Sequence, residues 1–246
     1  MIKVAIIDDG MSFNRLDNSF VSSEFEIMNQ KIRLYKSCKA HTDSHGLIVA
    51  SIINELKKID CSFISIKVKN NVSNGQCADF IYALDMCREL DVDIINSSLG
   101  TSYKKDYKLI QSKIVSLLKK NIIVVAATSN SPAITYPAYS EKVIGVRYNI
   151  RSIIGRNIFL ENSNYGVNIE SAPPKYLIDK DNLKMELELC NSFTAPVITS
   201  MLISNIANNG RTPYEDTINY LKTKSYYIKD NDMSPIRKNY CYNETI

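Results

Sequence analysis

The chain has 246 residues, 45% hydrophobic and 23% charged, which is enough for one large α/β domain with a substantial buried core. Its formal net charge of +4 comes from lysines spread along the whole chain, and without a basic stripe no nucleic-acid binding is expected. No window approaches the run of about 18 apolar residues that a membrane-spanning helix needs, so no membrane span is expected either.

The cysteines and the N-terminus indicate a reducing compartment. No two cysteines form a C-x-x-C pair, so the sequence does not indicate a zinc site. The segment Val4-Ala5-Ile6-Ile7 is typical of a strand rather than of a cleavable signal peptide. Without an export signal, reduced thiols and a cytoplasmic location are expected. The six cysteines are Cys38, Cys61, Cys77, Cys87, Cys190 and Cys241.

The first half of the chain alternates between apolar strands and amphipathic helices. Residues 2–7 form a short apolar strand that ends at Asp8-Asp9-Gly10. Residues 45–56 have the spacing of a helix and follow Asp43-Ser44, which are good N-cap residues. Further elements are predicted at 62–68 (strand), 78–90 (helix) and 92–96 (strand).

The second half continues this alternation. Residues 106–120 are predicted to be a helix, and 122–127 and 143–146 to be apolar strands. The last helix, 212–223, opens with Thr212 as N-cap, Pro213 at the first helical position and Glu215 as the capping-box acid. The polar tail 230–246 is expected to be loosely held. Because no repeat or linker interrupts the chain, residues 1–246 are expected to form a single domain.

This β-α-β rhythm predicts an α/β fold, with a mostly parallel central sheet covered by helices on both faces. In such sheets the working residues gather at the carboxyl ends of the strands. Three polar clusters in this chain directly follow apolar strands, and they therefore mark the expected site. They are Asp8-Asp9-Gly10, Ser98-Leu99-Gly100 and Ser129-Asn130.

Serine catalysis needs a hydroxyl, an imidazole that takes its proton and a carboxylate that orients the imidazole. The chain has only two histidines, His41 and His45, and His45 opens a predicted helix beside Gly46, where a backbone could approach closely. The hydroxyl candidate is Ser192, at the start of a helical segment. Taken singly, Ser192 is also interpretable as a helix N-cap, and His45 as a structural histidine.

Four motifs in one order resemble the subtilases, the subtilisin-like serine proteases. V-A-I-I-D-D-G around Asp8 resembles the aspartate motif, and D-S-H-G-L-I-V-A-S-I-I around His45 the histidine motif. N-S-F-T-A-P resembles the serine motif with Ser192 as the nucleophile, and residues 64–100 resemble the family between these motifs. The order Asp, His, Ser is that of the subtilases.

The resemblance assigns roles to these residues. Ser192 would attack the scissile carbonyl, His45 would serve as general base and then as acid, and Asp8 would hold the imidazole. The family's second oxyanion donor is an asparagine in a loop after an apolar strand, which corresponds to Asn130 in V-V-A-A-T-S-N. The calcium loops of the family are not recognisable, so neither a metal nor another cofactor is expected.

The resemblance also implies an extended peptide substrate, held as an added strand between two chain segments. Ser129 and Thr135 stand where the family commonly has glycine, so a shallow or polar S1 pocket is expected that prefers small or polar P1 residues. The oligomeric state is left open. The substrate-binding residues implied are Ser73, Asn74, Gly75, Gln76, Ser98, Leu99, Gly100, Ala127, Thr128, Ser129 and Thr135.

Departures from the family pattern leave two functions open. Cys190-Asn191 replace the usual Gly-Thr before the serine, and the chain has only 8 glycines. Asp9 is interpretable as a strand-end acid or as an attractor of basic substrate residues. The first function is a specialised processing endopeptidase, for example of a precursor or leader peptide, whose acyl-enzyme could also pass to an amine. The alternative is an inactive protein that binds peptides or a partner.

Overall fold

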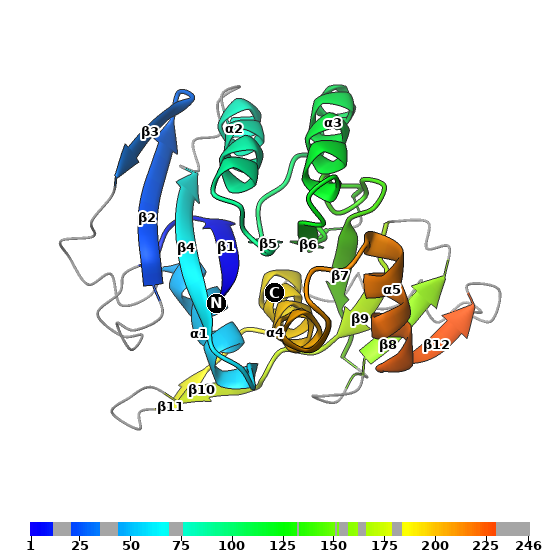
Figure 1. The fold of residues 1–246 in the computed structure, drawn as a ribbon. Helices are drawn as coiled ribbons and strands as arrows, with labels where there is room; N and C mark the ends of the chain where they lie inside the picture. Colours follow the sequence, from blue (N-terminus) through cyan, green and yellow to red (C-terminus); the bar gives the residue numbers. More distant parts are fainter. Residues whose placement is uncertain are drawn as a thin grey trace.

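A ten-stranded sheet forms the centre of the computed structural model, in the order β12-β8-β9-β7-β6-β5-β1-β4-β2-β3 (Figure 1). The structure describes residues 1–11, 21–34, 44–68, 76–131, 133–150, 152, 157–161, 166–178 and 184–229. The strands of the sheet are β1 (Ile2–Asp8), β2 (Val21–Met28), β3 (Lys31–Leu34), β4 (Cys61–Val68), β5 (Ile94–Ser97), β6 (Ile123–Ala127), β7 (Ile144–Tyr148), β8 (Asn157–Glu161), β9 (Ile169–Ser171) and β12 (Ser225–Lys229). A separate hairpin joins β10 (Tyr176–Ile178) and β11 (Lys184–Glu186). The helices are α1 (His45–Leu56), α2 (Gln76–Glu89), α3 (Tyr107–Leu118), α4 (Asn191–Asn209) and α5 (Tyr214–Thr223).

The middle of the sheet is parallel, as the sequence predicted. β1 pairs with both β4 and β5, and the parallel pairing continues through β6 and β7. Antiparallel pairs occur in the sheet between β2 and β3 and between β8 and β9. Ile7 is in register with Ser97, and Ser97 with Ala126, so the chain leaves these three strands at one common edge.

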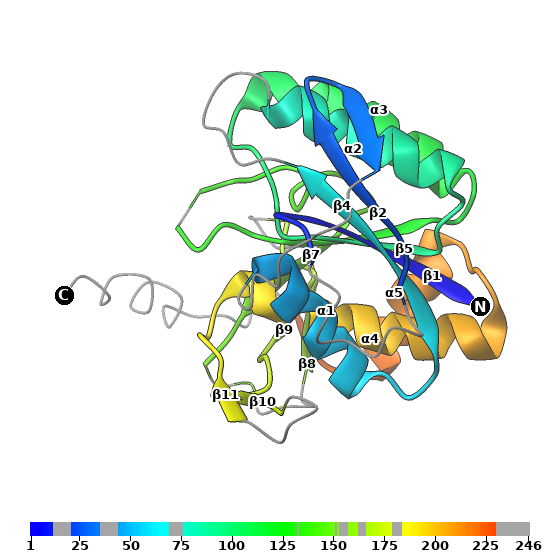
Figure 2. The ribbon, with the colours of Figure 1, turned by 90° about the vertical axis from the view of Figure 1, so that its left-hand side faces the viewer.

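Helices cover both faces of the sheet, which confirms the predicted architecture. In Figure 2, α2 and α3 lie above the sheet, and α1, α4 and α5 lie below it. Alternating side chains of β6 supply both cores, because successive residues of a strand point to opposite faces. Val124 and Ala126 pack with α2 and α3, whereas Ile123, Val125 and Ala127 pack with α1, α4 and α5.

The predicted elements are present, but the start of α5 was predicted wrongly. Pro213 is the N-cap rather than the first helical residue, and its carbonyl oxygen accepts the Thr217 amide at 3.0 Å. Thr212 does not cap the helix, because its hydroxyl pairs with the Thr217 hydroxyl at 3.0 Å. Glu215 forms an ion pair with Lys142 instead of completing a capping box.

The sequence analysis did not predict β2, β3 and the strands from β8 to β12. These strands pair with neighbours that are distant in the chain or follow a turn: β2 lies along β4, and β12 lies along β8. No helix in the described part of the chain is long and apolar enough to cross a membrane. The tail 230–246 lies outside the described residues, so its loose attachment and the single-domain organisation of the whole chain stay predictions.

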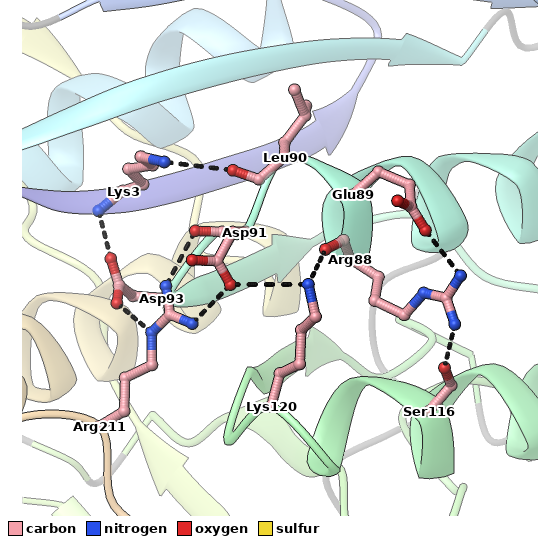
Figure 3. A network of polar contacts seen from close by, with 9 residues as sticks. All are labelled: Lys3, Arg88, Glu89, Leu90, Asp91, Asp93, Ser116, Lys120 and Arg211. Atoms are coloured by element: carbon pink, nitrogen blue, oxygen red, sulfur yellow. Dashed lines mark hydrogen bonds and ion pairs between the residues drawn. The ribbon is translucent and has the colours of Figure 1, made fainter.

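A polar network fastens the helical layer to the amino-terminal ends of the strands (Figure 3). Arg211, which lies between α4 and α5, donates to Asp93 at 2.5 Å and to the side chain of Asp91 at 2.8 Å. Asp93 is 8% exposed and also accepts the backbone N–H of Lys3 at 2.7 Å. One arginine therefore joins the α4–α5 connection to the segment before β5, at the end of the sheet opposite Asp8.

Candidate active site

The last residue of β1 and the first residue of α1 form a hydrogen-bonded pair. Asp8 is 3% exposed, and its two carboxylate oxygens lie 3.0 and 2.9 Å from Nδ1 of His45. The backbone N–H of Asp9 donates to Asp8 at 2.8 Å and holds the carboxylate in place. The predicted carboxylate and imidazole thus meet, although 37 positions separate them in the chain.

The next residue, Asp9, fixes the start of α1. Its carboxylate accepts the backbone N–H groups of His45 at 3.1 Å and of Gly46 at 2.9 Å. An anion is favourable there because the first amides of a helix are unpaired and the helix dipole is positive at that end. Ser44 adds the predicted N-cap by accepting the Leu47 amide at 3.4 Å. Asp9 therefore serves the helix that carries His45.

Gly46 permits the close approach that the sequence indicated. A Cβ atom at this position would lie 2.5 Å from the carbonyl oxygen of Gly10, closer than real side chains come to backbone. The first turn of α1 therefore lies directly against the loop that follows β1. This contact brings the His45 ring down to the edge of the sheet where Asp8 ends β1.

Ser192 lies in the first turn of α4, and Phe193 and Cys190, one residue after it and two residues before it, contact the His45 ring. The Phe193 ring stacks on the imidazole with centroids 4.9 Å apart, and the Cys190 side chain hydrogen-bonds to it. Cys190 is the N-cap of α4, so the interpretation of Ser192 as a helix N-cap is wrong. Within the described residues, the hydrogen-bond partners of the His45 ring are Asp8 and Cys190, and no hydrogen bond joins the Ser192 hydroxyl to the ring.

Asn130 lies next to the same helix terminus. Its side-chain oxygen accepts the backbone N–H of Asn191 at 3.1 Å, while the side chain itself is exposed. Since the amide oxygen is used as the acceptor, the Nδ2 group is the end of Asn130 that stays available to donate. The structure therefore brings Asn130 to the residue that precedes Ser192.

The predicted S1 walls also meet at this edge. The Ser129 amide donates to the Thr135 hydroxyl at 3.2 Å, which joins two of the wall segments. Gly100 lies against Tyr136, because an added Cβ would be 2.7 Å from its carbonyl oxygen. Ala127 differs from the expectation, since its side chain packs into the core with α1 and α4, and only its backbone is left to line a wall.

Not every predicted substrate residue can be placed. Ser73, Asn74 and Gly75 lie outside the described residues, and the side chain of Gln76, the first residue of α2, does as well. Ser98 and Leu99 follow β5 at the edge near Asp8, and the Leu99 carbonyl accepts the Ser97 hydroxyl at 3.0 Å. The described residues contain no cluster of three or more His, Cys, Asp or Glu side chains that could hold a metal.

The surroundings of His45 favour its protonated form. Burial on its own lowers the pKa of His45, but the hydrogen bonds to Asp8 and Cys190 and the charges of Asp8 and Asp9 outweigh it. Together these influences raise the pKa of His45 from 6.5 to about 10. At neutral pH both ring nitrogens of His45 therefore carry a proton. The ring can accept a proton from another group only after it has lost one, which happens as the pH rises toward about 10.

Sequence reasoning missed what Asp9, Cys190 and Asn191 contact. Asp9 was considered for its charge, whereas its neighbours are two helix amides. Cys190 and Asn191 stood out only as departures from a pattern, yet both contact site residues. Two consecutive departures directly before Ser192 were the available signal that this turn is built differently.

Comparison with known protein families gives a match over most of the chain. A model described as the subtilase family matches residues 1–223. Comparison with the curated protein sequences gave no match.

Solved structures of subtilisin-like proteases share the fold at low sequence identity. A cold-adapted subtilisin-like serine proteinase is 15% identical with a TM-score of 0.66, covering 89% of this chain and 80% of its own. The prenylagaramide maturation protease PagA is 16% identical with a TM-score of 0.61, covering 89% and 81%. The nisin leader peptidase NisP from Lactococcus lactis is 16% identical with a TM-score of 0.64, covering 93% and 85%. Because the family model covers nearly the whole described chain and the fold agrees, the chain belongs to the subtilase family.

Proposed function

We propose that this chain is a serine endopeptidase. The Ser192 oxygen attacks the scissile carbonyl while His45 takes the hydroxyl proton, and Asp8 stabilises the imidazolium that forms. His45 then returns the proton to the leaving amine, and water hydrolyses the acyl-enzyme. The observation that carries this proposal is the Asp8–His45 pair, with Phe193 and Cys190, on either side of Ser192 in the chain, in contact with the same ring.

The oxyanion of the tetrahedral intermediate would be bound by two donors. One is the backbone N–H of Ser192, which belongs to the first turn of α4 and has no partner within the helix. The other is Nδ2 of Asn130, whose amide oxygen is already engaged by Asn191. Removing one such donor typically lowers turnover by roughly 10²–10³.

The proposed substrate is an extended peptide. It would lie as an added strand between Ser98–Gly100 and the segment that contains Ser73 to Gln76, with its P1 side chain near Thr128, Ser129 and Thr135. The Ser129–Thr135 hydrogen bond supports the shallow, polar pocket, because it joins the two proposed walls through polar groups. Cleavage of matched peptides with P1 Ala, Leu, Phe and Arg tests the pocket, and a clear preference for Phe would contradict it.

We propose a processing role for this activity, acting on a precursor or leader peptide. Structures of the same fold include one described as a maturation protease and one described as a leader peptidase, which supports this substrate class. A cytoplasmic location belongs to the same proposal. It is supported by the free thiols of Cys61, Cys77, Cys87 and Cys190, which a reducing compartment would preserve.

One observation favours a second candidate, a peptide-binding protein that does not cut. The Cys190 side chain hydrogen-bonds to the His45 ring, and the raised His45 pKa of about 10 keeps that ring protonated at neutral pH. A protonated imidazole cannot accept the hydroxyl proton of Ser192. The two candidates therefore differ in whether Ser192 reacts once His45 is deprotonated.

A fluorophosphonate probe that labels activated serines distinguishes the two candidates. We expect the wild type to be labelled, and the labelling to be lost in Ser192→Ala. Ser200→Ala is the matched control, because Ser200 is a buried serine of the same helix whose hydroxyl bonds to Val197. Labelling is measured from pH 7 to pH 10, so that protonation of His45 does not conceal activity. A folded wild type that stays unlabelled over this range would favour the binding protein.

A further inference from the structure

The residue directly before Ser192 is buried, and both ends of its side-chain amide form hydrogen bonds. Asn191 is 6% exposed and is the first helical residue of α4. Its side-chain oxygen accepts the Tyr148 amide at 2.8 Å. Its Nδ2 group donates to the carbonyl oxygens of Ser129 at 2.8 Å and Thr128 at 3.3 Å, and to the Thr128 hydroxyl at 3.2 Å. Both protons and one oxygen lone pair of the amide are therefore in use.

These contacts join three separate segments at one edge of the sheet. Tyr148 ends β7, Thr128 and Ser129 follow β6, and Asn191 begins the helix that carries Ser192. Loss of the Asn191 side chain removes the donors that the carbonyl oxygens of Thr128 and Ser129 now accept. The segment after β6 is therefore hydrogen-bonded to the first turn of α4, which contains Ser192, in addition to being attached to β6.

The backbone of Asn191 extends the same connection to Asn130. Its N–H donates to the Asn130 side-chain oxygen at 3.1 Å, which decides which end of that amide can face a substrate. Asn191 thus contacts three consecutive residues, Thr128, Ser129 and Asn130, and is covalently bonded to Ser192. Asn191 consequently connects the proposed nucleophile, Ser192, to the proposed oxyanion donor, Asn130.

We propose that Asn191 is a positioning residue that holds the oxyanion donor Asn130 and the proposed S1 wall in register with Ser192. It acts through these groups and does not itself touch the substrate. The inference rests on the proposed peptidase function, because it assigns how that site is assembled. A displacement of about 1 Å at such a site is enough to lower the rate roughly 10²-fold, so this fastening has a direct kinetic consequence.

The test measures the rate constant of fluorophosphonate labelling at Ser192 in Asn191→Ala and Asn191→Asp. Alanine removes all the side-chain contacts, whereas aspartate keeps the acceptor for Tyr148 and replaces the donor. We expect both to label about 10²-fold more slowly than the wild type. Asn205→Ala is the matched control: Asn205 is 3% exposed in the same helix and bonds to Asn209, away from the site, and it should label like the wild type.

A double variant separates positioning from general stability. Asn130→Ala alone should slow labelling roughly 10²–10³-fold. If Asn191 acts through Asn130, the double variant labels no more than about threefold slower than the slower single variant, because the two losses are not additive. Additive losses, labelling of a folded Asn191 variant at the wild-type rate, or failure of both Asn191 variants to fold would overturn this inference alone. An unlabelled wild type would overturn it together with the proposed function.

Discussion

At the scale of single residues, the site differs from its family pattern mainly in the two residues before Ser192. Cys190 places its side chain against His45, and Asn191 ties the turn to the segment after β6. They stand where the pattern has glycine and threonine. The thiol of Cys190 and the amide of Asn191 form hydrogen bonds in a site whose Asp8 and His45 keep the expected arrangement.

The first prediction concerns pH. Because the Cys190 hydrogen bond raises the pKa of His45, Cys190→Ala should lower it and populate the neutral ring at lower pH. Labelling of the wild type should rise with pH toward about 10, and the same rise should occur at lower pH in Cys190→Ala. The cap itself is unaffected, since Cys190 makes no side-chain capping bond. Rate constants of labelling from pH 6 to pH 10 check this.

The control for that measurement is Cys190→Ser, which keeps a hydrogen-bonding group beside His45. Its pH profile should stay close to that of the wild type. If the alanine and serine variants have the same profile as each other and as the wild type, the Cys190 hydrogen bond has no part in setting the protonation of His45.

At the scale of elements, α1 is positioned by its first turn. Asp9 accepts two of its amides, Ser44 caps it, and Gly46 lets it lie against Gly10. The sequence indicated the cap and the close approach, because both depend on local residue types. It did not indicate the role of Asp9, because the amides that Asp9 accepts are 36 and 37 positions away.

The second prediction is that Gly46→Ala disturbs both stability and activity. The added Cβ would lie 2.5 Å from the Gly10 carbonyl oxygen, so α1 must shift away from β1. We expect a loss of about 1–3 kcal/mol in the free energy of unfolding and slower labelling of Ser192. Urea unfolding and probe labelling measure the two effects. Ser51→Ala in the same helix should change neither by much, and equal stability of Gly46→Ala and the wild type would contradict the close packing.

At the scale of the whole molecule, the site and the Arg211 network lie at opposite ends of the strands, because Asp8 ends β1 whereas Asp93 precedes the parallel strand β5. The network joins the α4–α5 connection to Asp93 and Asp91 before β5. It contains no residue of the proposed site. The structure therefore predicts that stability and activity respond separately to substitutions at the two ends.

The third prediction follows from that separation. Arg211→Ala leaves the buried carboxylate of Asp93 without its guanidinium partner, and it should lower the free energy of unfolding by about 2 kcal/mol. The rate of Ser192 labelling should stay at the wild-type value at temperatures where the variant is folded. Lys120→Ala, which removes an exposed lysine near Asp91, should change stability by no more than about 0.5 kcal/mol. A similar change in both variants would contradict the role of the buried contact.

Sequence alone predicted the architecture, which the structure confirms, and it selected the candidate site residues. An apolar run such as β6, I-V-V-A-A, is typical of a strand that is buried on both faces, and such strands predict a parallel sheet. The two histidines and the ordered motifs were enough to select Asp8, His45 and Ser192. These features are local, because hydrophobic period and residue type are properties of short segments.

Only the tertiary structure decided how these residues are held. The edge strands form only when they pair with a neighbouring strand. The hydrogen bonds of Asp9 and Asn191 join residues that are 36 to 63 positions apart in the chain. The hydrogen bond of Cys190 to His45 likewise depends on the packing of α4 against α1. Hydrogen bonds and pKa shifts arise from distances in space, and the spacing of residues along a chain does not specify those distances.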